Sequence, residues 1–221
     1  MRLFFIILLC LGGINASKAQ HPRKWGWSID GSVLLSSEYG NYIADSSVKL
    51  HYVLNKNITI GLGGMYLFTH TDNYKWQCGD YIYTYEEDSQ MKINAVGNVM
   101  LNIPIVGKTG IMCDVIGFSS IFPFESVKIS QSPISNITHY SEYKDKIHFD
   151  YFSSGLFTNI GVYHDFEEDD FTNRIAFSYG IGYYDPLKGS RHANVFEQNI
   201  GSHLPKQKIF HCLTLRLIFL K

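Results

Sequence analysis

Alternation between apolar and polar residues over long segments is the feature that most constrains this chain. Across residues 91–103 the odd-numbered positions carry apolar or small side chains, and the even-numbered positions carry mostly polar ones. A period of two is that of a β-strand, whose successive side chains point to opposite faces of a sheet. The same pattern recurs over residues 25–36, 48–54, 58–69, 110–122, 147–164, 171–185 and 209–220. The sequence therefore predicts an all-β chain with eight strands.

The links between these strands alternate in length. Those after the second, fourth and sixth strands are a few residues long, whereas those after the third, fifth and seventh cover residues 70–90, 124–146 and 186–208. The first link, 37–47, is intermediate. Short turns at one end and long loops at the other are typical of bacterial outer-membrane barrels. Seven of the eight predicted strands have ten residues or more, which exceeds the usual ~5–6 residues of strands in soluble domains. We therefore expect an antiparallel, up-and-down transmembrane β-barrel.

Composition agrees with a barrel whose wall faces lipid. Charged residues make up only 18% of the chain, compared with about 25% in ordinary globular domains. One face of each predicted strand is almost free of charge, as lipid requires, because a lysine or arginine at the membrane midplane costs ~2–4 kcal/mol. The formal net charge of −1 indicates no nucleic-acid partner.

The first residues have the pattern of a cleaved signal peptide. Arg2 is followed by an apolar run over residues 3–14, and Ser17-Lys18-Ala19 places small residues at the two positions that a signal peptidase recognises. We expect residues 1–19 to be removed after Ala19 and residues 20–221 to form the barrel domain. Three cysteines then remain, at positions 78, 113 and 212, and an odd number argues against a disulfide scaffold.

Charged residues of both signs fall on the polar faces, which a membrane barrel turns inward. We expect them to pair as an ion-pair network, because single buried charges are costly and eight strands leave room for side chains only. The alternative is a narrow conductive path. The set comprises Asp30, Lys49, Lys92, Asp114, Asp150, Arg174 and Arg216. The nine histidines are scattered without the close spacing of a zinc site, so neither a metal nor another cofactor is expected.

The last strand ends in Leu213-x-Leu215-Arg216-Leu217-x-Phe219, an alternating run that finishes on an aromatic residue. In this and in its architecture the mature chain resembles the small eight-stranded outer-membrane barrels of the OmpA/OmpX-like group, including the PorT-type barrels of Bacteroidetes. The resemblance implies location in the outer membrane of a Gram-negative cell envelope. It also implies contact with outer-membrane lipid and lipopolysaccharide, and recognition of the last strand by the barrel-assembly machinery. Here two further residues, Leu220 and Lys221, follow the aromatic one.

The loop at 70–90 is rich in aromatic residues. These are Tyr74, Trp76, Tyr81, Tyr83 and Tyr85. Exposed aromatic side chains suit contact with a protein partner or a glycan, whereas the alternative places them in the aromatic girdle at the lipid interface. The alternation over residues 81–85 also predicts that the strands continue past the membrane as a hairpin. A non-enzymatic barrel with a structural, adhesive or surface-binding role is the leading hypothesis.

Two other functions remain as alternatives. The triplet His139-Tyr140-Ser141 resembles the catalytic spot of the lipid A deacylases, which implies His139 as the base and Ser141 as the nucleophile. The same alternation would also fit a soluble periplasmic, lipocalin-like carrier. In that case the apolar faces would line an internal cavity and the charged faces would meet water.

Overall fold

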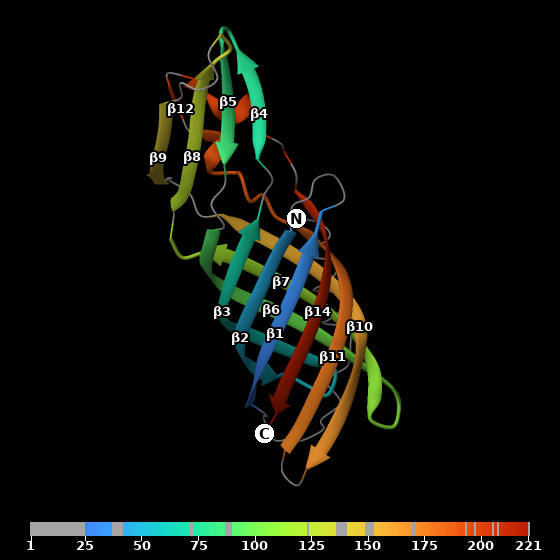
Figure 1. The fold of residues 1–221 in the computed structure, drawn as a ribbon. Coiled ribbons are helices and arrows are strands. Elements are labelled where there is room, and N and C mark those ends of the chain that lie inside the picture. Colours follow the sequence, from blue (N-terminus) through green and yellow to red (C-terminus); the bar gives the residue numbers. More distant parts are fainter. Residues whose placement is uncertain are drawn as a thin grey trace, which may run out of the picture.

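The computed structural model describes residues 25–36, 42–70, 73–86, 90–122, 124–135, 141–148, 153–168, 171–192, 194–196, 198–204, 206 and 208–220. Eight of its strands form a closed antiparallel barrel, in the order β1-β14-β11-β10-β7-β6-β3-β2 (Figure 1). They are β1 (Trp25–Leu35), β2 (Tyr42–Val53), β3 (Ile58–His70), β6 (Gln90–Val106), β7 (Thr109–Ser120), β10 (Ser154–Glu168), β11 (Phe171–Tyr183) and β14 (Ile209–Leu220). The predicted fold class is confirmed. The predicted signal peptide lies outside the described residues.

Every barrel strand pairs with the barrel strand that follows it along the chain, and the last strand closes on the first. The β1–β14 register runs from Gly26 opposite Leu220 to Leu35 opposite His211. The two described ends of the chain therefore lie at one rim, together with the β2–β3 and β6–β7 turns. We call this rim the short-turn end and the opposite rim the long-loop end. In the described part of the chain, no helix is long and apolar enough to cross a membrane.

Local chemistry explains the short turns. In the β2–β3 turn the side-chain oxygen of Asn55 accepts hydrogen bonds from the backbone N–H groups of Asn57 and Ile58, both at 2.9 Å. In the β6–β7 turn Gly107 has a φ of 55°, a left-handed conformation that glycine adopts without a steric penalty. These residues fix which strands become neighbours.

Two strand boundaries differ from the prediction. β2 begins at Tyr42, not at Val48, so the first link is short. The predicted sixth strand, 147–164, joins two elements, because residues 147 and 148 end a strand of another sheet and β10 begins at Ser154. In the alternation of residues 147–164, Phe157 shares a face with Phe149 and Tyr151, which predicts that it lies on the apolar outer face. In the structure Phe157 is 1% exposed and points inward. The upper part of the lumen is apolar, so polarity alone assigned this side chain to the wrong face.

The remaining elements form a compact cap above the long-loop end, visible at the top of Figure 1. Its four-stranded antiparallel sheet has the order β4-β5-β8-β9. The sheet strands are β4 (Tyr74–Cys78), β5 (Tyr81–Glu86), β8 (Phe124–Pro133) and β9 (Ser141–His148). The last long loop adds a two-stranded hairpin, β12 (Asn194–Val195) and β13 (Gln198–Asn199), and two 3-10 turns, η1 (Ser190–His192) and η2 (Ile200–Ser202). The hairpin predicted near residues 81–85 is the β4–β5 pair, which joins the cap sheet instead of extending the barrel strands.

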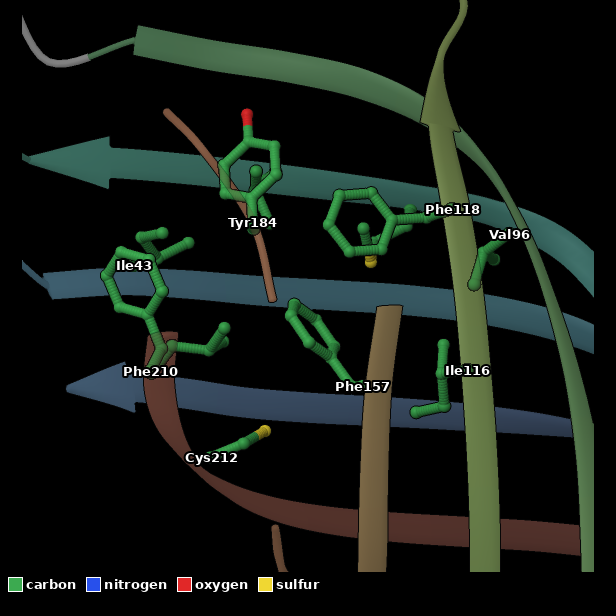
Figure 2. Close-up of a cluster of buried hydrophobic side chains, with 11 residues drawn as sticks. Ile43, Val96, Ile116, Phe118, Phe157, Tyr184, Phe210 and Cys212 are labelled. Atoms are coloured by element: carbon green, nitrogen blue, oxygen red, sulfur yellow. The ribbon is translucent and has the colours of Figure 1, made fainter. Parts of the chain in front are cut away.

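An apolar cluster fills the lumen toward the long-loop end. Figure 2 shows the rings of Phe118, Phe157 and Tyr184 gathered in the lumen; they come from β7, from β10 and from the segment that follows β11. The rings of Phe118 and Phe157 lie 4.9 Å apart, and those of Phe118 and Tyr184 lie 5.3 Å apart. The cluster also contains Leu34, Ile43, Met65, Leu67, Val96, Ile116, Phe210 and Cys212. We call it the upper plug.

Candidate functional site

A charged cluster occupies the middle of the lumen below the upper plug. Arg216 is fully buried, and its guanidinium donates to Asp30 Oδ2 at 2.9 Å and to Asp114 Oδ2 at 2.6 Å. Lys49, also buried, forms a second ion pair with Asp30. The four side chains come from β14, β1, β7 and β2, and each lies at an inward-facing position of its strand. The cluster joins strands on different sides of the barrel.

The other predicted lumen charges do not join this cluster. Lys92 lies near the long-loop end, where its Nζ is 3.5 Å from the hydroxyl of Tyr184 and 3.4 Å from the backbone oxygen of Pro186. Arg174 lies toward the short-turn end and holds both carboxylate oxygens of Asp165, at 2.6 and 2.8 Å. In the described part of the chain, the contacts of the predicted lumen charges therefore fall into three groups at three heights. Asp150 lies outside the described residues.

Two neutral side chains extend the central cluster and were missed as site residues. Asn98 donates to Asp114 Oδ1 at 3.0 Å, and the Nε2 atom of His51 lies 2.8 Å from the hydroxyl of Ser28. A Cβ atom at Gly61 would overlap both the Asn98 and His51 side chains, so glycine makes room for them. Their inward positions in the alternation were the signal that could have identified them.

A second apolar layer closes the lumen below the charged cluster. It consists of Met100, Met112, Tyr163, Ala176 and Ile218, with Leu220 packed against it. The charges thus lie between two apolar layers, and the sulfur of Met100 is 2.9 Å from Arg216 Nη1. Among the described residues, no group of three or more histidine, cysteine or acidic side chains is placed to hold a metal ion.

The outer wall of the barrel has the opposite polarity. Large apolar side chains point away from the lumen and are exposed on every barrel strand, among them Ile29, Val48, Leu62, Val99, Val115, Ile160, Phe177 and Leu215. At the outward positions for which the structure describes the side chain, none of the residues is Asp, Glu, Lys or Arg. Aromatic rings pair on this wall near the short-turn end, with Trp25 and Tyr52 4.8 Å apart and Trp27 and Phe219 4.3 Å apart.

The loop aromatics form the core of the cap. Tyr83 and Tyr85 are 3% and 0% exposed, and Tyr74 and Trp76 pack beside them. Residues of the last long loop complete this core, namely Leu187, Val195, Ile200 and Leu204. Burial raises the pKa of the Tyr83 phenol above its ordinary value. Of the five predicted surface-binding aromatics, Tyr83 and Tyr85 are therefore buried packing residues, Tyr74 and Trp76 are partly buried beside them, and Tyr81, at 41% exposed, is the most exposed.

The segment that follows β11 contributes side chains both to the upper plug and to the core of the cap. Tyr184 belongs to the upper plug, and three residues later Leu187 belongs to the cap core. Within the same stretch, the hydroxyls of Ser190 and Tyr85 lie 3.1 Å apart, and Arg191 forms an ion pair with Asp185. The cap is consequently fixed to the barrel mouth through packed side chains as well as through its chain connections.

The structure places the candidate nucleophile away from the barrel wall. Ser141 is exposed and begins β9 in the cap, where it pairs with Gln131 of β8. His139 lies outside the described residues. Among the described residues, no basic side chain contacts the hydroxyl of Ser141.

The chain is similar to several solved structures at low sequence identity. No family model matches the chain, and no curated protein matches its sequence. Similar solved structures include Neisserial surface protein A, with a TM-score of 0.39, 7% identity and coverage of 90% of this chain and 95% of that one. Ail, the attachment invasion locus protein of Yersinia pestis, is similar in its complex with the heparin analogue sucrose octasulfate (TM-score 0.37, 9% identity, 91% and 100% covered). It is also similar without that analogue (TM-score 0.35, 10% identity, 91% and 100% covered). The barrel topology stated above rests on the strand pairing of this chain itself.

Proposed function

We propose that this protein is an integral outer-membrane β-barrel whose cap acts at the cell surface as a non-enzymatic contact or adhesive module. The observation that carries the proposal is the inverted polarity of the barrel. Its charged side chains are buried in the lumen and its large aliphatic side chains are exposed on the wall. Water would oppose such an arrangement, since apolar burial is worth ~25 cal/mol per Å², and lipid would favour it.

Two features disfavour a soluble carrier. The exposed apolar residues occur on all eight barrel strands, whereas soluble monomers seldom expose a continuous apolar patch above a few hundred Å². The lumen is occupied by the upper plug, the charged cluster and the lower apolar layer. A carrier needs a cavity where these side chains lie.

The long-loop end is the side we assign to the exterior, because outer-membrane barrels carry their long loops outside and their short turns in the periplasm. The cap then projects from the cell as a packed unit with its own core. Its sheet turns the aromatic face inward and leaves Lys75 and Gln77 exposed on the other face. A fixed polar surface of this kind suits contact with a macromolecule or glycan.

The same proposal includes the partners of the barrel wall. The outward side chains of β14 alternate through Leu213, Leu215 and Leu217 toward Phe219, the arrangement expected of a last strand that the assembly machinery recognises. Outer-membrane lipid and lipopolysaccharide would surround the wall. A deacylase function has no comparable support, because Ser141 lies in the cap and not beside acyl chains.

Fractionation of the expressed full chain tests the proposal. We expect the protein to remain in carbonate-washed outer membranes and to migrate faster on a gel before heating than after it. N-terminal sequencing of the mature form should begin at Gln20. Recovery of a folded protein from the soluble periplasm would contradict the membrane assignment. A lipid A profile that changes on overexpression would contradict the non-enzymatic role.

A further inference from the structure

One sector of the outer wall departs from the apolar pattern close to the long-loop end. On β11 the outward residues Tyr179 and Tyr183 are about half exposed. On β14 the exposed, outward residue is His211, which pairs with Ile181 across the two strands. Just before β14 stand Lys206, which is exposed, and Lys208, which is half-buried. Two phenols, an imidazole and two ammonium groups thus gather at one rim.

The side chains of this sector are held in place. The hydroxyl of Tyr179 lies 2.6 Å from Nδ1 of His211, and the two rings stack. This contact fixes the imidazole and leaves its Nε2 atom for another partner. The Nζ atom of Lys208 lies 5.9 Å from the centre of the Tyr183 ring, within the range of a cation–π contact. The backbone oxygen of Lys208 accepts from the N–H of Tyr184 at 2.8 Å, which anchors the lysine at the rim.

Among the described residues, the positive charge of this sector has no acidic partner. In the part of the chain that the structure describes, no carboxylate pairs with Lys206 or Lys208. At the same rim, Lys92 points into the lumen and Arg191 pairs with Asp185. The two unpaired lysines therefore present positive charge on the outside of the barrel, at the boundary between lipid and water.

We propose that this sector binds the phosphate of an outer-leaflet lipid head group, an inference that rests on the membrane location proposed above. Phosphate oxygens take charge-assisted hydrogen bonds from ammonium and imidazole groups, and tyrosines favour the membrane interface. The four steps along the strand from Tyr179 to Tyr183 span roughly 14 Å, at ~3.4 Å per residue. That length fits a head group lying against the wall better than a free phosphate ion.

Native mass spectrometry of the detergent-solubilised full chain tests this site. The probes are lipid A that carries its phosphates and the same lipid without them. The test variant is Lys208→Gln combined with His211→Gln, and the control is Lys56→Gln at an exposed lysine of the opposite rim. Heat-dependent gel migration verifies that each variant is folded. We expect the double variant to bind the phosphorylated lipid about tenfold more weakly, which corresponds to ~1.4 kcal/mol, and the control to bind it as the wild type does.

The outcomes separate the site from the membrane location. Equal binding of phosphorylated lipid by the wild type and the double variant would overturn the site, as would equal binding of both lipids by the wild type. Displacement of the lipid by inorganic phosphate would overturn the assignment to a head group. Failure of the folded protein to float with phospholipid vesicles would contradict the proposed membrane location instead.

Discussion

Replacement of Arg216 by methionine should be among the most destabilising single changes in the barrel. The guanidinium is fully buried and holds two carboxylates. Asp30 keeps Lys49 as a partner when the arginine is lost, whereas among the described residues Asp114 keeps only the amide of Asn98. Removal of one partner from a buried ion pair costs about 3–5 kcal/mol. At ~1.4 kcal/mol per factor of ten, the unfolding constant should rise by two to three orders of magnitude or more.

A second substitution identifies the cause. If Arg216→Met lowers the stability because it leaves the buried charge of Asp114 without a cation, then adding Asp114→Asn should recover most of the lost stability. In the double variant the remaining central charges, Lys49 and Asp30, balance each other. Replacing a buried ion pair with apolar or neutral groups of similar volume is often close to neutral. We expect a coupling energy of about 2 kcal/mol or more between the two sites, within the range observed for contacting residues.

Urea unfolding of the refolded protein in lipid vesicles, followed by tryptophan fluorescence, provides the measurement. All four members of the double-mutant cycle are compared, with gel migration as an independent probe of folding. Additive losses, with the double variant less stable than Arg216→Met, would refute the reasoning. That result would mean that water reaches the central cluster and screens the carboxylate.

Four further outcomes follow from the packing. Gly63→Ala should cost ~1–3 kcal/mol, since its Cβ would overlap a backbone carbonyl of β2, whereas Gly64→Ala meets nothing within 4 Å and should be neutral; urea titration compares them. Tyr85→Ala should open the cap to limited proteolysis while heat-dependent migration of the barrel persists, and Tyr85→Phe should protect the cap nearly as well as the wild type. Leu215→Lys should destabilise the protein in vesicles by ~2–4 kcal/mol, but would be tolerated if this wall faced water. Planar bilayers should show no steady conductance for the wild type; ion flow equal to that of an open pore would contradict the plugged lumen around Phe157.

The alternation predicted most of the barrel because one face of each strand meets a uniform environment. On β6, β11 and β14 most outward positions follow from the sequence, because lipid favours apolar side chains there; His211 of β14 is an exception close to the long-loop end. The inside of the barrel is less uniform. Phe157 was assigned to the wrong face because the lumen changes from charged at Arg216 to apolar in the upper plug. The polarity of a side chain indicates whether it points inward or outward only where one face of the strand is polar and the other is apolar along its whole length.

The cap was beyond this kind of inference for a different reason. Tyr83 and Tyr85 alternate as in any half-buried strand, and the pattern gives no sign of what covers them. Their cover is Leu187, more than a hundred positions further along the chain and in a segment without strand periodicity. Contacts so distant in sequence depend on the complete fold, and the single chain carries no local signal for them.

The shared core of the cap has a consequence for the order of assembly. The sheet strands β4, β5 and β8 are complete early in the chain, but their aromatic face is covered by residues 187–204, which directly precede the final strand. Contacts of such long sequence separation form slowly. The cap core therefore cannot be complete until residues 187–204 are in place, so an assembly intermediate that lacks them should expose an apolar aromatic surface at the mouth of the barrel. A chaperone that protects that surface would be needed only during this interval.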